Sequence, residues 1–160
     1  MSAFDRIAVG EAHEFGSHIF TAGEIKRFAG AFDPQPFHLD EEAAKDSIFG
    51  ALCASGWHTA SAMMRLLVDH FTRLAERARA AGEAPLTIGP SPGFEQLKWL
   101  RPVFAGDTVA YTGLILGKRA SRSRPGRGIM SMETTGANQK GEAVFAVTTH
   151  VFVRIEPDPA

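Results

Sequence analysis

Residues 55–81, SGWHTASAMMRLLVDHFTRLAERARAA, form the longest helical pattern in this 160-residue chain. Apolar side chains recur in it at steps of three and four residues, as one face of an α-helix requires: Trp57, Ala60, Met64, Leu67, Val68, Phe71 and Leu74. Gly82 follows as a helix-stop signal. The first half is apolar on most sides and predicts a helix enclosed by other structure, whereas the charged second half is expected to project into water.

The chain after this helix changes to strand-like sequence. Residues 83–93 predict a loop, because prolines and glycines crowd them. Four segments with strand character follow, separated by turn-rich breaks: FEQLKWL (94–100), DTVAYTGLILGKRA (107–120), GIMSMETTGA (128–137) and EAVFAVTTHVFVRI (142–155). The last is clearest, with apolar side chains on one face: Phe145, Val147, Val151, Val153 and Ile155. Residues 137–141, ANQKG, fit a hairpin connection.

The region before the long helix predicts one strand and two shorter helices. Residues 13–20 resemble a short strand, and Thr21 with Glu24 forms a capping box for a helix of about three turns. Asp40 is expected to cap a short helix that follows it.

This order of elements predicts a single α+β domain over residues 1–160, in which a curved antiparallel sheet wraps around the long central helix. One enclosed helix covers only one side of such a sheet. Pairing between two copies would complete the burial, so we expect a homodimer or a larger even oligomer.

Composition narrows the function classes. A net charge of −1 and a pI near 6.6 give no electrostatic case for a nucleic-acid or membrane partner. The N-terminal residues lack the basic and apolar regions of a signal peptide, and no apolar run is long enough to span a bilayer. We therefore expect a cytoplasmic protein. Cys53 is the only cysteine, so no intrachain disulfide and no cysteine-based metal site are expected.

The segment DPQPFH, residues 33–38, carries the best candidate catalytic pair. Its two prolines predict a stiff loop that cannot be helical from Asp33 to His38. Such a loop can direct both side chains at one small volume, and an Asp/His pair that converges on a water is suited to general acid–base chemistry. The structural alternative is a connector in which Asp33 caps a neighbouring helix and His38 fills a surface gap.

Three motifs together resemble the MaoC-like dehydratase family, the hot-dog-fold (R)-specific enoyl-CoA hydratases. GAFDPQPFHLD (30–40) is similar to the hydratase motif of that family, ASGW (54–57) to the start of its central helix, and LKWLRPVFAGDTVAYTG (97–113) to the strands that follow. The resemblance implies a hot-dog fold and reversible hydration of 2-enoyl thioesters, a reaction of fatty acid metabolism.

The resemblance also implies residue roles. Asp33 and His38 would hold one water between them, with Asp33 as the base for attack on C3 and His38 completing proton transfer to C2. The backbone amide of Gly56 would donate to the thioester carbonyl oxygen. No metal and no redox cofactor are implied, and coenzyme A or acyl carrier protein would enter as part of the substrate.

Further residues are candidates for substrate binding. Gln35 stands where the family usually has Asn, and Ser55 stands where it usually has His. Ser55 could bind substrate or cap the central helix, and we favour the cap. Trp57 and Phe37 could line an acyl pocket, although helical spacing makes most such side chains core. 

The segment KRASRSRPGR, residues 118–127, concentrates positive charge in a turn between two strands. Arg122 and Arg124 could anchor the phosphates of coenzyme A. The alternative, a solvated hairpin turn, is favoured. His58 is expected to be a satisfied core histidine and Cys53 a small buried hydrophobe, and His150 on the polar face of the last strand receives no role.

Two other functions remain open. A hot-dog thioesterase would use a carboxylate to activate water, but Ser55 and Gly56 stand at the helix start where no separate acidic residue is found. A non-catalytic acyl-thioester-binding subunit would be expected to have lost Asp33 or His38, and both are present.

Overall fold

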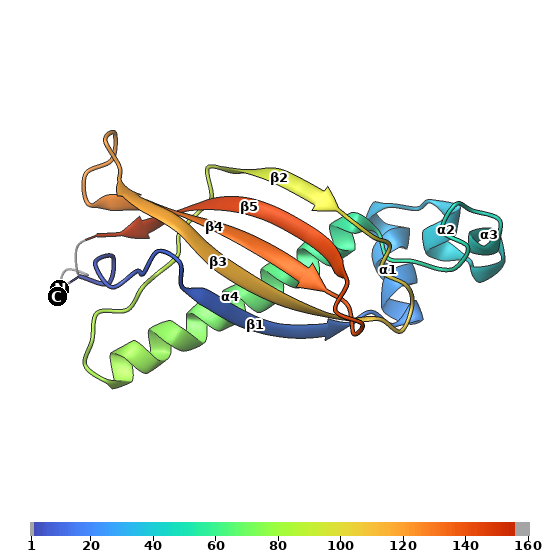
Figure 1. Cartoon of the computed structure of the whole chain (residues 1–160), viewed down its shortest axis with the longest axis horizontal. Helices are drawn as coiled ribbons and strands as arrows, with labels where there is room; N and C mark the ends of the chain where they lie inside the picture. The colour runs from blue at the N-terminus through green and yellow to red at the C-terminus, as the bar shows by residue number, and fades with distance from the viewer. Residues whose placement is uncertain (1, 156–160) are drawn as a thin grey trace.

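The computed structural model describes residues 2–155 and confirms the α+β architecture, with a curved antiparallel sheet along one long helix (Figure 1). The elements follow in the order β1 (Ala12–Ile19), α1 (Ala22–Phe32), α2 (Pro36–Leu39), α3 (Glu41–Lys45), α4 (Gly56–Ala80), β2 (Gly93–Trp99), β3 (Thr108–Ala120), β4 (Arg127–Ala137) and β5 (Ala143–Arg154).

The five strands form one sheet in the order β1-β3-β4-β5-β2, and every neighbouring pair is antiparallel. Helix α4 crosses one face of the sheet, α1 to α3 gather at one end, and the β3–β4 turn lies at the opposite end (Figure 1). The strands β1 and β2 are the two edges, so each has one side without a partner strand in the described chain.

Helix α4 keeps one buried face from His58 to Ala75. Met63, Leu67 and Phe71 are buried on the sheet side, and the Tyr111 hydroxyl of β3 donates a hydrogen bond of 2.9 Å to the Thr59 carbonyl. The expectation that the second half projects into water was right for only part of its surface, because Phe71 and Ala75 remain buried. A helix on a curved sheet keeps one covered face even where its outer face is charged.

The backbone between residues 33 and 39 corrects one prediction. His38 lies in the short helix α2, which begins at Pro36, whereas the prolines had predicted a loop through His38. Proline is well accommodated at the first helical position, because the amide hydrogen that it lacks has no partner there. Gln35, the N-cap residue directly before Pro36, is extended at φ −84° and ψ 142°.

An apolar stripe remains exposed on α4 and on the edge strand beside it. This apolar stripe consists of six half-exposed side chains: Trp57, Met64, Val68, Phe94, Trp99 and Leu100. The three inner strands, β3, β4 and β5, alternate between buried and more exposed positions, as a sheet with one covered face requires. No helix within residues 2–155 is both long and apolar enough to cross a membrane.

Candidate active site

Asp33 and His38 meet where α1 passes into α2. Asp33 is the C-cap residue of α1 and donates its backbone N–H to the Ala29 carbonyl at 2.9 Å. Nε2 of His38 lies 3.4 Å from Oδ2 of Asp33. The side chain of His38 is 7% exposed and that of Asp33 is 20% exposed. The two residues that the sequence singled out therefore form a pair in a largely covered position.

The tautomer of neutral His38 follows from the contact of its other ring nitrogen. Nδ1 lies 2.7 Å from the Cys53 carbonyl oxygen. A carbonyl oxygen can only accept, so Nδ1 carries the hydrogen and donates it. In the neutral ring Nε2 is then unprotonated and faces Asp33, free to accept a proton from a bound molecule.

Asp33 is held as a carboxylate by its neighbours. Burial raises the pKa of Asp33, but hydrogen bonds from Ser55 and Gln35 and the nearby His38 lower it by more, so its pKa lies below the ordinary value. Nε2 of Gln35 donates to Oδ1 of Asp33 at 2.7 Å. Gln35, a candidate for substrate binding, thus contacts the carboxylate, and its longer side chain spans the distance within the turn.

The start of α4 supplies the second half of the site. Ser55 is fully buried, and its hydroxyl accepts a hydrogen bond from the backbone N–H of Trp57 at 3.3 Å, so it caps the helix as predicted. The Ala54 N–H bonds to the Val103 carbonyl at 2.8 Å and fixes the approach of the chain. As the first residue of α4, Gly56 has an N–H with no acceptor within the helix, at the positive end of the helix dipole.

Trp99 is a residue at this site that the sequence reasoning missed. A Cβ atom placed on Gly56 would lie 2.3 Å from the Trp99 ring, so the indole packs directly on the glycine. Trp57 packs edge-on against Trp99, with ring centroids 5.1 Å apart. The sequence signal was the strand segment that contains Trp99, but no spacing rule connects the end of β2 with the start of α4.

The remaining candidates divide into those near the site and those far from it. Phe37 packs edge-on against His38 and against Phe49, so it supports the imidazole ring. Arg122 and Arg124 lie in the exposed β3–β4 turn, at the opposite end of the sheet (Figure 1). The Arg124 guanidinium lies 5.0 Å from the centre of the Phe152 ring. Within one chain these arginines are not brought to Asp33.

His58 is buried, as expected, but it is not a satisfied core histidine. Its ring stacks on Phe28 with centroids 4.8 Å apart, while Nδ1 is buried without a hydrogen-bond partner among the described residues. Burial, with the nearby His18, lowers the pKa of His58 to about 4, so the ring is neutral at physiological pH. 

The lone thiol is not an activated nucleophile, and residues 2–155 hold no group of side chains suited to a metal ion. Cys53 is buried as predicted, and burial raises its pKa to about 11, so the thiol stays protonated. Among residues 2–155, no three His, Cys, Asp or Glu side chains converge in a way that could hold a metal ion. A large apolar hollow of about 470 Å³ lies farther along α4, between Met64 and Arg79.

The curved antiparallel sheet along one long helix is a hot-dog fold. The family described as MaoC like domain matches residues 8–138, and this chain belongs to that family. It is 42% identical to the MaoC-like dehydratase from Rhodospirillum rubrum, whose crystal structure superposes with a TM-score of 0.81 over 96% of this chain and 97% of that one.

Other relatives extend the comparison. An uncharacterized protein, YdeM of Bacillus subtilis, is 26% identical over 94% of this chain and 97% of its own length. Mesaconyl-CoA hydratase of Cereibacter sphaeroides is 37% identical over 62 residues, which are 39% of this chain and only 18% of that protein. The (R)-hydratase from A. caviae shares the fold, with a TM-score of 0.63 at 24% identity over 94% of this chain and 98% of that one.

Proposed function

We propose that this chain is a hydro-lyase that reversibly hydrates 2-enoyl thioesters to 3-hydroxyacyl thioesters. One observation carries the proposal: the Nε2 atom of His38 and the Oδ2 atom of Asp33 lie 3.4 Å apart, with Nδ1 of His38 committed to the Cys53 carbonyl. When His38 is neutral, this arrangement directs one carboxylate oxygen and one imidazole nitrogen that can accept a proton at a single small volume. A water bound there has two groups that can accept its proton.

The reaction follows from these two groups. Asp33 accepts one proton of the bound water while the water oxygen forms a bond to C3 of the enoyl chain. The electron pair of the C2–C3 double bond moves toward the thioester carbonyl and gives an enolate. His38 then relays the proton from Asp33 to C2 on the same face, so that one water is added in total. General acid–base groups of this kind supply roughly 10²–10⁴-fold each.

The enolate oxygen needs a donor, and the Gly56 N–H is the candidate. It lies at the first position of α4, where the backbone amides are unpaired and carry partial positive charge. One such donor contributes about 3–4 kcal/mol to the stability of a developing oxyanion. Ser55 supports both halves of the site, because it caps α4 and also hydrogen-bonds Asp33.

Product analysis separates this reaction from the thioesterase alternative. With crotonyl-CoA, we expect mass spectrometry to detect the substrate plus one water, with no release of free thiol. Free coenzyme A without a hydrated product would contradict the hydratase and support the thioesterase. Saturable binding without either product would instead support the non-catalytic acyl-thioester-binding subunit.

The proposal also covers the partners of the chain. The substrate is an acyl thioester of coenzyme A or acyl carrier protein, no metal or redox cofactor takes part, and the protein works in the cytoplasm. We further propose a homodimer that covers the apolar stripe, because the stripe lies along the edge strand β2, whose outer side has no partner in the described chain. Exposed edges and apolar patches of this kind favour association.

Light scattering tests the dimer. We expect twice the chain mass for the wild type, and a monomer for Val68→Glu, which places a charge within the apolar stripe. Arg73→Glu is the matched control, because Arg73 is an exposed α4 residue outside the apolar stripe. A wild-type monomer at all concentrations would refute this part of the proposal.

A further inference from the structure

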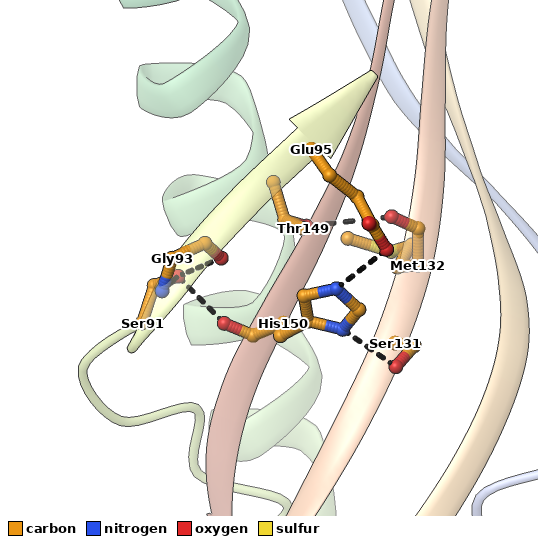
Figure 2. Close-up of polar contacts among 7 residues, drawn as sticks. All are labelled: Ser91, Gly93, Glu95, Ser131, Met132, Thr149 and His150. Atoms are coloured by element: carbon orange, nitrogen blue, oxygen red, sulfur yellow. Dashed lines mark hydrogen bonds and ion pairs between the residues drawn. The ribbon is translucent and has the colours of Figure 1, made fainter. Parts of the chain in front are cut away.

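The outer face of the sheet carries a second cluster of polar side chains, and none of them belongs to the site of Asp33 and His38. His150 of β5 alternates with the buried Thr149 and Val151, so its side chain lies on the face away from α4. Its two neighbours there are Glu95 of β2 and Ser131 of β4 (Figure 2). Three adjacent strands therefore each supply one side chain to the same place.

The distances connect these side chains in one chain of hydrogen bonds. Nε2 of His150 lies 3.1 Å from Oε1 of Glu95, and Nδ1 lies 2.8 Å from Oγ of Ser131 (Figure 2). An ionised carboxylate only accepts, so Nε2 carries the hydrogen toward Glu95. In the neutral ring Nδ1 then accepts the hydroxyl hydrogen of Ser131. The order is carboxylate, imidazole, hydroxyl, as in a base-activated serine.

The cluster opens into a hollow of about 340 Å³ that Arg119 and Phe94 also line. The hollow is at the lower end of the size range of small-molecule sites. The side chain of His150 is 31% exposed and that of Glu95 is 61% exposed, so a small molecule can reach Ser131 from solvent. Arg119 places a positive charge in the same hollow, where it can stabilise an oxyanion.

We propose that Ser131 is an activated nucleophile and that this hollow is an acyl-transfer site for small esters, independent of Asp33. The Ser131 Oγ forms a bond to the ester carbonyl carbon as its proton passes to Nδ1 of His150. The bond to the alkoxy oxygen breaks, and the departing alcohol takes that proton. Water then repeats the two steps and releases the acid. Glu95 is a positioning residue, which fixes the tautomer of His150.

The first test uses the wild-type protein and a small alkyl fluorophosphonate. Attack by Oγ forms a P–O bond and expels fluoride, with the proton taken by His150. We expect peptide mass spectrometry to find the label on Ser131. Ser91 is the matched control, because its Oγ lies nearby but donates to the backbone carbonyls of Gly93 and His150 and has no imidazole partner (Figure 2). Label on Ser91 rather than Ser131, or on neither serine, would overturn the proposal.

Variants then test each group. We expect His150→Ala to label about 100-fold more slowly than wild type, and added imidazole to restore much of that rate, as expected for a lost general base. Glu95→Gln should slow labelling with an unchanged Tm, whereas Ser91→Ala should label like wild type. Hydrolysis of p-nitrophenyl acetate should fall in parallel. Equal labelling of His150→Ala and wild type without imidazole would show that the hydrogen-bonded cluster is only a structural tie between strands.

Discussion

The Trp99 indole lies directly on Gly56, close enough that a Cβ atom at position 56 would sit 2.3 Å from the ring. This contact joins the end of the edge strand β2 to the first residue of α4. Glycine is therefore required there for space. The same contact places the Trp99 ring beside the backbone amide that we propose as donor to the thioester carbonyl oxygen. We therefore expect the end of β2 and the start of α4 to form this part of the site jointly.

A double-mutant cycle tests this contact. Gly56→Ala should lower the free energy of unfolding by about 1–3 kcal/mol, because an added methyl group has no room beside the indole. In the Trp99→Ala background the same substitution should cost much less. Urea unfolding, monitored by circular dichroism, measures the free energy of unfolding of all four proteins. An equal cost in both backgrounds would show that Trp99 does not determine the need for glycine.

The Ser55 hydroxyl has two contacts, and its removal should give two separable effects. Ser55→Ala should destabilise the protein by about 1 kcal/mol through loss of the α4 cap. It should also raise the pKa of Asp33, because a hydrogen bond that favours the carboxylate is lost. Since hydration requires ionised Asp33, activity should then begin to fall at a higher pH during acidification. The pH–rate profile measures this shift.

The matched control for Ser55 lies on the same helix. Ser61 is exposed, and its hydroxyl donates to the Trp57 carbonyl at 2.7 Å. Ser61→Ala should leave both the acidic limb of the profile and the stability nearly unchanged. An unshifted acidic limb in Ser55→Ala would show that Ser55 does not lower the pKa of Asp33.

His58 predicts how stability depends on pH. Its pKa is about 4 in the folded protein, lowered by burial first and then by His18 and Arg27, with Glu24 acting in the opposite direction. The unfolded chain has an ordinary histidine pKa near 6.5, so between these values it binds more protons than the folded chain. Stability contributed by neutral His58 is therefore present above pH 6.5 and is lost as the pH falls toward 4.

The variant His58→Phe isolates this effect, because a phenyl ring can keep the stacking on Phe28 but cannot titrate. Between pH 6.5 and 4 the wild type should lose roughly 3 kcal/mol more unfolding free energy than the variant. Denaturant titrations at several pH values measure the difference. Parallel curves would mean that folding does not lower the pKa of His58.

The sequence was sufficient for elements with strong local signals. The helical spacing after Ser55 gave α4, and the Thr21 and Asp40 caps gave the starts of α1 and α3, as the structure confirms. The start of α2 was missed because Pro36 is compatible both with an extended loop and with the first turn of a helix. Proline at position 36 is thus compatible with two backbone conformations, and the sequence alone does not decide between them.

Contacts between distant segments were beyond the reach of spacing rules. Trp99 on Gly56 and Glu95 beside His150 both depend on where β2 returns to the sheet, which no local pattern specifies. The unpaired Nδ1 of His58 likewise depends on which rings surround it. The Asp33/His38 pair could be predicted because both residues lie within one short segment.

The most direct test of the central claim is the rate at which the enoyl-thioester absorbance of crotonyl-CoA is lost, measured for wild type, Asp33→Asn and His38→Ala. We expect the wild type to hydrate the substrate and each variant to be slower by at least about 100-fold. Asp33→Asn should still bind the substrate, because the amide is close in size to the carboxylate. Hydration that survives both substitutions would contradict the assignment of Asp33 and His38 as the catalytic pair.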